Sequence, residues 1–288
     1  MFYTMERIKH DLFGECVALK NQNIRAVISP IFGLSLIDLC FQDIPILDRS
    51  REQAFFESRK GLGPLILPHF NQRESLPEVD FEAFEHVHYL RNMNVRDPFQ
   101  HGVGRYAEWR YTADTDSVTG RLSSTDHIQG YAISQITGFT FDAEVCYRIT
   151  ETGLNIKFEL TAEQPVEAGI HFYYDLKNRE SAAAELPLEG QSETVVFLFD
   201  RGHDKTYRPS KTNRFATYIL KTDRYVLRTI VPVLGDPSST FDAVTLFSPE
   251  GERFVCIEPL SFSQTGQNEK RSFRGSILLE LDSPPRPV

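Results

Sequence analysis

The chain has 288 residues, of which 41% are hydrophobic and 25% are charged, as in an ordinary globular protein. Its net charge of −9 argues against the basic surface that nucleic acids and anionic membranes require. The 4 cysteines stand singly, so neither a disulfide framework nor a paired-cysteine metal site is predicted. Residues 1–15 lack the apolar core of a signal peptide, and no apolar run is long enough to span a bilayer. We therefore expect a cytoplasmic protein.

Strand patterns recur along the whole chain, as short runs rich in β-branched and aromatic residues between turn residues. The predicted strands cover residues 23–28, 33–41, 61–68, 141–150, 154–161, 168–174, 194–199, 225–231, 243–247, 253–257 and 276–281. Only residues 50–60 and 179–186 predict helices, both of them short. The sequence therefore predicts an all-β fold with few short helices. We expect a large antiparallel β-sandwich or barrel that forms a single domain over residues 1–288.

Two histidines lie in segments that favour contact with a ligand. His101 belongs to a loop, Gln100-His101-Gly102, whose glycine permits close approach of the backbone to a ligand. His171 lies inside an aromatic predicted strand, where a buried imidazole without a partner is costly. Both histidines also fit a structural role, as a loop histidine and a hydrogen-bonded core histidine respectively.

Glu258 follows the apolar run at residues 253–257 and precedes Pro259, which lacks a backbone donor. The pattern predicts that a strand ends here and places Glu258 at the mouth of a sheet. Burial at that position raises the pKa of a carboxyl group and makes it a usable base near neutral pH. A solvated residue directly after a strand is the alternative interpretation.

Polar loop residues complete the candidates for ligand binding. Asn71 and Arg73 follow Pro68, and Asp200 and Asp204 follow the predicted strand at residues 194–199. Such side chains hydrogen-bond sugar hydroxyls, although turn formation is the commoner role of Asp. No phosphate-binding loop or metal-binding motif is present, and His86 and His88 alternate on a possible strand without a third ligand. The sequence predicts no metal and no cofactor.

Four segments, in order, resemble motifs of the aldose 1-epimerase (galactose mutarotase-like) family over about residues 22–282. They are Pro68-His69-Phe70-Asn71-Gln72-Arg73, Gln100-His101-Gly102 with the stretch to Trp109, Gly169-Ile170-His171-Phe172-Tyr173-Tyr174-Asp175-Leu176, and Val255-Cys256-Ile257-Glu258-Pro259. Phe172 and Asp175 replace the family's proline and asparagine, and Gln72 interrupts its Asn-Arg pair.

The resemblance implies a galactose mutarotase-like β-supersandwich and an isomerase that interconverts the α and β anomers of a hexose without a cofactor. It implies that Glu258 is the base, that His171 is the acid and that His101 supports charge near the ring oxygen. We expect the neighbouring carboxylate to keep His171 protonated at neutral pH. The implied sugar-binding residues are Asn71, Arg73, Asp204, Trp109 and Tyr173. Core packing is the alternative role of the aromatic rings.

Other functions remain open at this point. A hexose-6-phosphate 1-epimerase of the same fold needs a basic pocket, for which Arg73, Arg96 and Arg105 are candidates. A non-catalytic carbohydrate-binding protein would keep the fold without turnover. A polysaccharide lyase or hydrolase needs a pair of carboxylates or a Tyr/His arrangement, which the sequence does not place. The expected partner is a small sugar, and the chain is expected to be a monomer or a homodimer.

Overall fold

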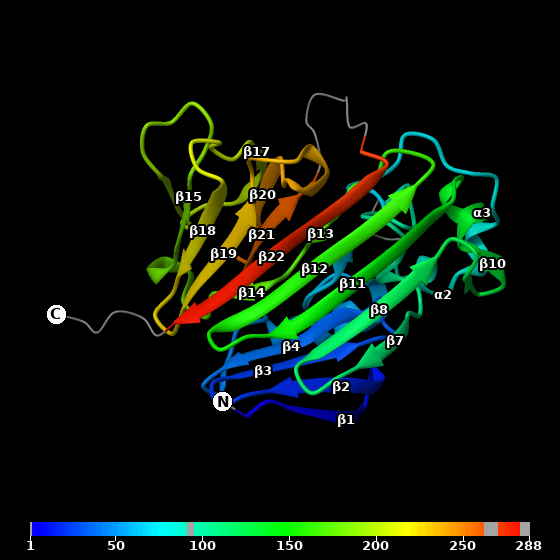
Figure 1. Cartoon of the computed structure of the whole chain (residues 1–288), viewed down its shortest axis with the longest axis horizontal. Helices are drawn as coiled ribbons and strands as arrows, with labels where there is room; N and C mark the ends of the chain where they lie inside the picture. The colour runs from blue at the N-terminus through cyan, green and yellow to red at the C-terminus, as the bar shows by residue number, and fades with distance from the viewer. Residues whose placement is uncertain (1, 91–94, 262–269, 283–288) are drawn as a thin grey trace.

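The computed structural model describes residues 2–90, 95–261 and 270–282, which form antiparallel sheets joined by long loops (Figure 1). One sheet follows the order β1-β2-β3-β4-β5, with β1 (Thr4–His10), β2 (Gly14–Lys20), β3 (Ile24–Ser29), β4 (Ser35–Phe41) and β5 (Ile44–Pro45). A nine-stranded sheet follows the order β16-β15-β18-β19-β22-β12-β11-β8-β7. Its strands are β16 (Val195–Leu198), β15 (Ala183–Leu186), β18 (Phe215–Lys221), β19 (Val226–Pro232), β22 (Ser272–Asp282), β12 (Gly153–Ala162), β11 (Phe141–Ile149), β8 (Ser117–Ser123) and β7 (Arg110–Ala113).

A third, six-stranded sheet carries Glu258 and Asp204, and His171 and Tyr173 lie between two of its strands. It follows the order β17-β20-β21-β13-β6, and β14 pairs with β21 beside this path. Its strands are β17 (His203–Tyr207), β20 (Ala243–Ser248), β21 (Phe254–Leu260), β13 (Gly169–Ile170), β6 (Leu65–Ile66) and β14 (Tyr174–Asp175). A small ribbon pairs β9 (His127–Ile128) with β10 (Tyr131–Ala132), and the helices are α1 (Glu52–Ser58), α2 (Glu85–Leu90) and α3 (Ile133–Thr137). Within the described ranges, no helix has the length and apolar character needed to cross a membrane.

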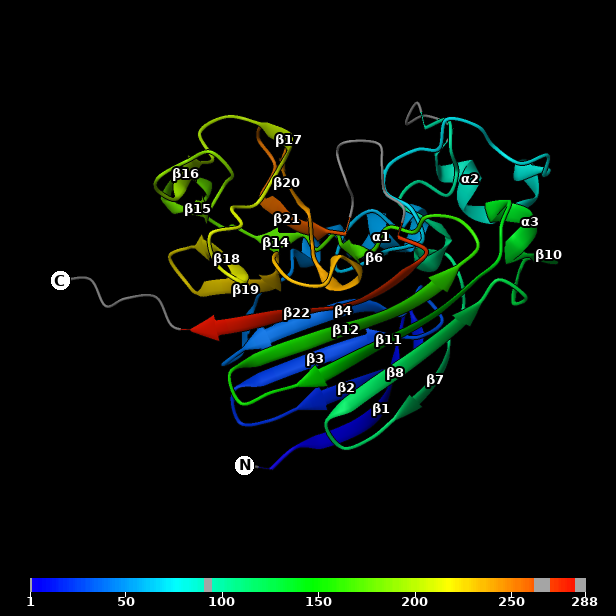
Figure 2. The ribbon, with the colours of Figure 1, turned by 45° about the horizontal axis from the view of Figure 1, so that its top comes forward.

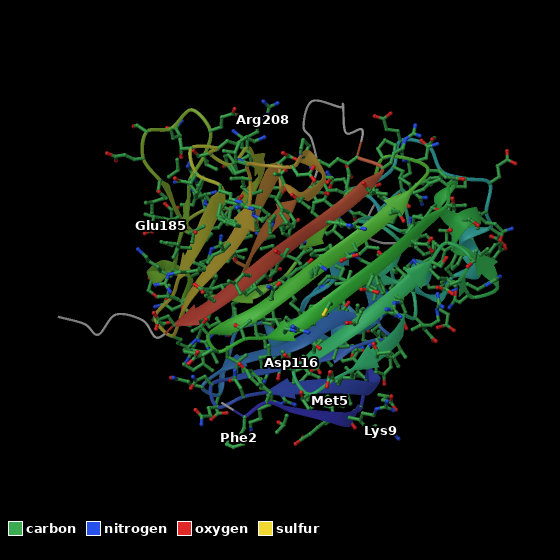
Figure 3. The ribbon with its side chains drawn as sticks, in the orientation of Figure 1. Phe2, Met5, Lys9, Asp116, Glu185 and Arg208 are labelled. Atoms are coloured by element: carbon green, nitrogen blue, oxygen red, sulfur yellow. The ribbon has the colours of Figure 1, made fainter. Side chains whose placement is uncertain are left out.

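The five-stranded and nine-stranded sheets pack face to face around one hydrophobic core. Figure 2 shows β1 to β4 lying beside β12, β11 and β8. Leu19 and Val27 from the first sheet and Val145 and Ile156 from the second belong to the same buried cluster. Charged side chains such as Lys9 and Arg208 extend outward (Figure 3). Burial of the two facing surfaces is the main source of stability in such a sandwich.

The periodic segments of the sequence fold as predicted. β3 pairs with β4, and β11 pairs with β12, each in an antiparallel hairpin. Within β12, the apolar side chains at alternate positions are all at most 1% exposed: Leu154, Ile156, Phe158 and Leu160. The alternation in β12 arises because one of its faces is buried and the other is not, which imposes a period of two. β3 and β4 are buried on nearly every residue and were predicted as apolar runs.

The predicted helix at residues 179–186 is wrong. A short 3₁₀ turn at Arg179–Ser181 leads into strand β15, which pairs with both β16 and β18. Pairing on both sides overrides the local helix preference. Strands β1 and β2 lie in a charged stretch for which no strand was predicted, and His86 and His88 lie on helix α2 rather than on a strand.

Two predictions about strand ends are also wrong, and both concern the site. β21 does not stop at Glu258 but continues through Pro259 to Leu260. Proline removes only its own donor, and the residues on either side keep their pairing with Thr245 and Ala243 of β20. The predicted strand at residues 168–174 is divided into β13 and β14, with His171, Phe172 and Tyr173 between them.

The loop that carries His101 approaches the backbone of another loop too closely for any side chain. Gly102 has a φ of +91°, and a Cβ at this position would lie 1.9 Å from the carbonyl oxygen of Leu67. Gly130 has the same φ of +91°, yet a Cβ there would meet no atom within 4 Å. A comparison of substitutions at the two glycines therefore distinguishes the effect of backbone strain from the effect of steric contact.

We predict that Gly102→Ala destabilises the protein more than Gly130→Ala. Both variants incur the strain of a positive φ, roughly 1–2 kcal/mol. Only Gly102→Ala also forces two backbone segments apart, which adds about 1–3 kcal/mol, the usual cost of overpacking. Chemical denaturation of both variants measures the difference in unfolding free energy. Equal losses would show that the contact with Leu67 is not restrictive.

A half-buried glutamate anchors the loop that follows β6. The N–H of Phe70 donates to Oε2 of Glu167 over 2.6 Å, and the N–H of Glu167 donates to the carbonyl oxygen of Pro68 over 2.8 Å. Burial raises the pKa of Glu167 from 4.5 to about 7, although the hydrogen bond from Phe70 lowers it. Glu167 therefore titrates near neutral pH in the folded protein.

We predict that Glu167 makes stability fall as the pH rises from about 4.5 to about 7. In this window the folded protein holds a proton that the unfolded chain has lost, so deprotonation favours unfolding. The contribution reaches up to about 3 kcal/mol, since one pKa unit corresponds to about 1.4 kcal/mol. Glu167→Gln keeps an oxygen acceptor for Phe70 but does not titrate. Its unfolding free energy, measured against wild type at several pH values, should lack this decrease; parallel curves would contradict the assignment.

Candidate active site

A cavity of about 180 Å³ lies between the six-stranded sheet and the loops that cover it. Its volume is below the roughly 300–1,000 Å³ of pockets for drug-sized ligands, and it suits a small molecule. Its lining residues are Lys60, Phe70, Asn71, Gln100, His101, Arg105, His171, Tyr173, Asp204, Thr245, Phe247 and Glu258. All three predicted catalytic residues are among them, together with Asn71, Tyr173 and Asp204.

The sheet places Glu258 beside polar residues of neighbouring strands. In the strand register, Glu258 of β21 pairs with Thr245 of β20, and Phe247 of β20 pairs with Asp204 of β17. Because side chains two residues apart point to the same face, these four residues line the same side of the sheet. Asp204, and not Asp200, therefore lies at the cavity. Glu258 is 1% exposed, so it is not the solvated residue after a strand that was the alternative interpretation.

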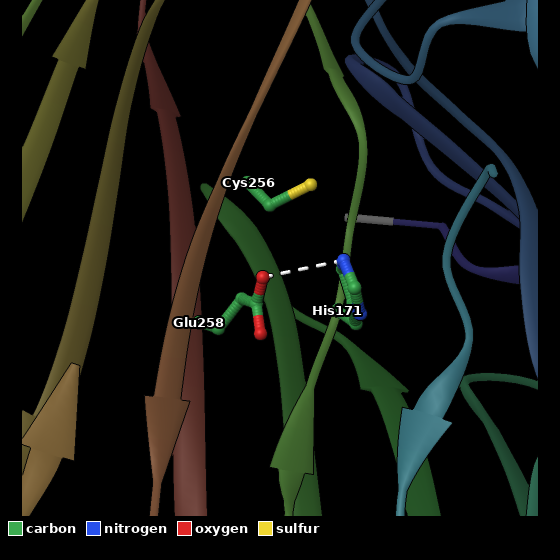
Figure 4. A group of neighbouring side chains, drawn as sticks. All are labelled: His171, Cys256 and Glu258. Carbon is green, nitrogen blue, oxygen red and sulfur yellow. Dashed lines mark ion pairs between the residues drawn. The ribbon is translucent and has the colours of Figure 1, made fainter. Parts of the chain in front are cut away.

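His171 meets Glu258 from the break between β13 and β14 (Figure 4). Its Nε2 lies 3.2 Å from Oε1 of Glu258, and its ring stacks on Tyr173 with centroids 5.0 Å apart. Neither ring nitrogen of His171 meets hydrogen-bond geometry with an atom of the described residues, so the contact with Glu258 is close but not aligned. Oε2 of Glu258 likewise has no partner among the described residues. These polar atoms are free to bond a ligand.

The main chain fixes the tautomer of His101. The N–H of Asn71 donates to Nδ1 of His101 over 3.2 Å, and the N–H of His101 donates to the carbonyl oxygen of Asn71 over 2.9 Å. Because Nδ1 accepts, the proton of the neutral ring sits on Nε2. The ring of His101 lies edge-on to that of His171, with centroids 5.0 Å apart. His101 thus offers a hydrogen-bond donor next to the His171–Glu258 pair.

Arg73 does not line the cavity, contrary to its predicted role in sugar binding. Its Nε and Nη2 donate to the carboxylate of Asp97 over 2.8 Å each, and its Nη1 donates to the carbonyl oxygen of Ile136 over 2.6 Å. Asp97 is fully buried, so this ion pair is a structural connection between two loops. Arg73 therefore stabilises the segment that carries Asn71. Its own donors are bonded to Asp97 and Ile136 and do not face the cavity.

Trp109 likewise lies outside the cavity, in the hydrophobic core. It is 3% exposed, and its indole N–H donates to the carbonyl oxygen of Gly104 over 2.8 Å. Packing, the alternative role, accounts for this residue, and it ties the end of the loop at residues 100–105 to the core. Tyr173 is the predicted aromatic residue that does reach the cavity.

Burial shifts the acid–base groups toward their uncharged forms. Burial raises the pKa of Glu258 well above 4.5; Arg105 lowers it and Asp204 raises it further. Burial, followed by the positive charges of Arg105 and Lys60, lowers the pKa of His171 well below 6.5. Burial is also the main reason that the pKa of His101 is lowered. Burial therefore opposes the expectation that the neighbouring carboxylate keeps His171 protonated.

Arg105, which the sequence indicated only as a candidate phosphate ligand, lies four residues after His101 and lines the cavity. It is 1% exposed, and its Nη2 has no hydrogen-bond partner among the described residues. Neither Arg105 nor Lys60 forms an ion pair with a carboxylate in the described part of the chain, so two cations face the cavity unpaired. Thr245 and Phe247 were missed; the register of β20 against β21 would have indicated them.

Two residues of the cavity, His171 and Glu258, form a group with the chemistry of a metal site together with the neighbouring Cys256. One ligand atom each from His171, Cys256 and Glu258 lies within 4.8 Å of the others, and all three residues are buried. Cys256 and Glu258 project from the same face of β21 toward His171 (Figure 4). Spacing along the sequence gave no indication of this group, because His171 comes from a distant segment.

Solved structures with the same architecture cover nearly the whole chain. They include a galactose mutarotase-related enzyme from Lactobacillus acidophilus (15% identity, TM-score 0.65, covering 95% of this chain and 99% of that one). A galactose mutarotase-like protein from Clostridium acetobutylicum is 10% identical, with a TM-score of 0.66 and coverage of 98% and 99%. A galactose mutarotase-like protein from Lactobacillus casei is 13% identical, with a TM-score of 0.67 and coverage of 93% and 100%.

These likenesses concern three-dimensional structure. No protein-family model matches the sequence, and no curated protein matches it significantly. At identities of 10–15%, the agreement over 93–98% of the chain establishes the arrangement of strands and leaves the activity to be argued from the site. The chain has the galactose mutarotase-like β-sandwich fold that its sequence motifs led us to expect.

Proposed function

We propose that the protein is an aldose 1-epimerase, an isomerase that interconverts the α and β anomers of a hexose. The observation that carries the proposal is the 3.2 Å contact between His171 Nε2 and Glu258 Oε1 in a cavity that also contains His101. Opening a sugar ring needs a base at the anomeric hydroxyl and an acid at the ring oxygen. Two such groups in contact with one small cavity meet that need. The names of the similar structures favour the same activity.

In the proposed reaction, the Glu258 carboxylate removes the proton of the anomeric hydroxyl. The bond between the anomeric carbon and the ring oxygen breaks as the carbonyl forms, and His171 delivers a proton to the ring oxygen. His101 donates its Nε2 hydrogen toward the ring oxygen and supports the charge that develops there. The open-chain aldehyde rotates about its first carbon–carbon bond and recloses with the roles of Glu258 and His171 reversed.

The pair needs only one proton for this cycle. Burial favours neutral Glu258 and neutral His171, a state in which the proton resides on the carboxyl group. Transfer of that proton across the 3.2 Å contact produces the carboxylate and imidazolium that start the reaction. The positive charge of Arg105 stabilises the Glu258 carboxylate, because it lowers the pKa of that group.

The remaining lining residues fit the binding of a sugar. Asn71 and Asp204 provide polar groups for hydroxyls, and Tyr173 and Phe247 provide apolar walls for the carbon-bound face of the ring. Arg73 contributes by holding the loop of Asn71.

A hexose 6-phosphate is the second candidate substrate, and the unpaired cations favour it. Lys60 and Arg105 both line the cavity, and neither has a carboxylate partner within ion-pair distance among the described residues. A phosphate group would supply the missing negative charge. Of the other arginines considered, Arg73 is bound to Asp97, and Arg96 is exposed and donates to the carbonyl oxygen of Arg73.

We predict that Glu258→Gln and His171→Asn each lower kcat for mutarotation by about 10²- to 10⁴-fold, the usual contribution of a positioned acid or base. The double variant should lose little more than either single variant, because the two groups share one proton. Polarimetry of freshly dissolved α-glucose, α-galactose and α-glucose 6-phosphate gives the rates.

The matched controls are Glu159→Gln on β12 and His88→Asn on α2, which lie away from the cavity and should retain full activity. Thermal melting shows whether each variant is folded. Wild-type protein that accelerates none of the three sugars would exclude the proposed activity and favour a carbohydrate-binding protein without turnover. Folded Glu258→Gln or His171→Asn with normal kcat would contradict the assigned roles.

We predict that Lys60→Met distinguishes the two substrate classes. If the sugar carries a phosphate, the variant should raise KM for glucose 6-phosphate at least about 10-fold, the equivalent of one lost charge-assisted hydrogen bond of about 1.5–3 kcal/mol. Its KM for glucose should not change. Lys205→Met on β17 is the control, since Lys205 is exposed and does not line the cavity. An equal KM for glucose 6-phosphate in Lys60→Met and wild type would exclude Lys60 as a phosphate ligand.

A further inference from the structure

Three neighbouring side chains are of the types that bind metal ions: His171, Cys256 and Glu258. The proposed reaction uses only two of them. The reaction uses His171 and Glu258 and gives no role to the buried thiol of Cys256. Their ligand atoms all lie within 4.8 Å of one another. In a tetrahedral zinc site, ligand atoms are about 3.5 Å apart, given bond lengths of about 2.0–2.3 Å. The His171–Glu258 separation of 3.2 Å already agrees with this geometry.

The backbone keeps these three residues together. Cys256 and Glu258 are two positions apart on β21, so their side chains share one face of the strand. His171 is fixed from the other side, because β13 and β14, which flank it, both pair with β21. The widest separation of the ligand atoms therefore shortens to about 3.5 Å when side-chain rotation moves these atoms by roughly 1 Å, and the sheet need not move.

Unpartnered polar atoms give the second, independent indication of a ligand. Both ring nitrogens of His171 and Oε2 of Glu258 are buried without a hydrogen-bond partner in the described part of the chain. A buried polar atom without a partner costs free energy, which a bound group can recover. The cavity on the open side of the pair leaves room for water or a hydroxyl as the fourth ligand.

We propose that His171, Cys256 and Glu258 bind one Zn²⁺ ion, with a fourth position open to the cavity. The ligand types select the ion, because thiolate and imidazole favour Zn²⁺ over Mg²⁺ and Ca²⁺. Bound Zn²⁺ engages the atoms of His171 and Glu258 that the sugar needs. Micromolar Zn²⁺ is therefore an inhibitor that competes with the sugar, a consequence that rests on the proposed epimerase activity, whereas binding itself does not.

Co²⁺ is the probe for the test, because a tetrahedral thiolate complex of Co²⁺ absorbs visible light and shows a sulfur-to-metal charge-transfer band. Co²⁺ added to the full chain should give both absorptions at a stoichiometry of one, and Zn²⁺ should abolish them. Cys256→Ser should lose the charge-transfer band and weaken Zn²⁺ binding at least about 100-fold by calorimetry, because even outer-sphere partners contribute about 10- to 100-fold. Cys146→Ser, at a half-buried cysteine on β11, should behave as wild type.

Several outcomes would overturn the site. They are no Co²⁺ spectrum with wild type, an unchanged spectrum in Cys256→Ser, or loss of binding in Cys146→Ser. If Cys256→Ser does not fold, Glu258→Gln replaces it and should also weaken Zn²⁺ binding; unchanged affinity there would overturn the proposal. In the activity assay, Cys256→Ser should keep the turnover of wild type in metal-free buffer but lose inhibition by Zn²⁺. Binding of Zn²⁺ to a protein without epimerase activity would support the site and exclude only the competitive consequence.

Discussion

The burial of Glu258 inside β21 is the constraint on which the rest of the site depends. At 1% exposure, the carboxyl group has lost its hydration. Among the described residues on the same side of the sheet, the polar groups near it are the hydroxyl of Thr245 on β20 and the like-charged Asp204 on β17. The sheet alone therefore cannot stabilise an ionised Glu258. Compensation has to come from the loops above it, and the loops provide His171 at 3.2 Å and the positive charge of Arg105.

Those loops are held in place by interactions of their own. Asn71 and His101 exchange two hydrogen bonds, although both residues adopt a positive φ, of 60° and 65°. Arg73 joins the same region to Asp97, and Gly102 lies against Leu67 where no side chain fits. Strained backbone persists only where the surroundings over-determine it. The result is a histidine with one tautomer and one orientation before any ligand binds, which is the kind of preorganisation that electrostatic catalysis requires.

Sequence reasoning recovered what depends on local pattern or on single residues. The alternation in β12 predicted its buried face, and short motifs indicated Glu258, His171 and His101. It failed where contacts distant in sequence decide the outcome. Residues 183–186 became a strand because β16 and β18 flank them, and β21 passes through Pro259 because pairing on either side compensates for the missing donor. Arg73 lies outside the cavity for the same reason, since its partner Asp97 could not be identified from the sequence.

In the proposed reaction, the unpaired cations would link the acid–base chemistry to the choice of substrate. A buried arginine without a carboxylate partner is costly, and the cost falls when a negative charge appears nearby. Among the described residues that line the cavity, Glu258 and Asp204 are the carboxyl groups that can supply this charge. A neutral hexose leaves Arg105 available to stabilise the Glu258 carboxylate, whereas a phosphate would bring its own charge and compete for the same guanidinium. Lys60, on the same cavity wall, is the group that would allow both demands to be met at once, because it can bind the phosphate while Arg105 stays with Glu258.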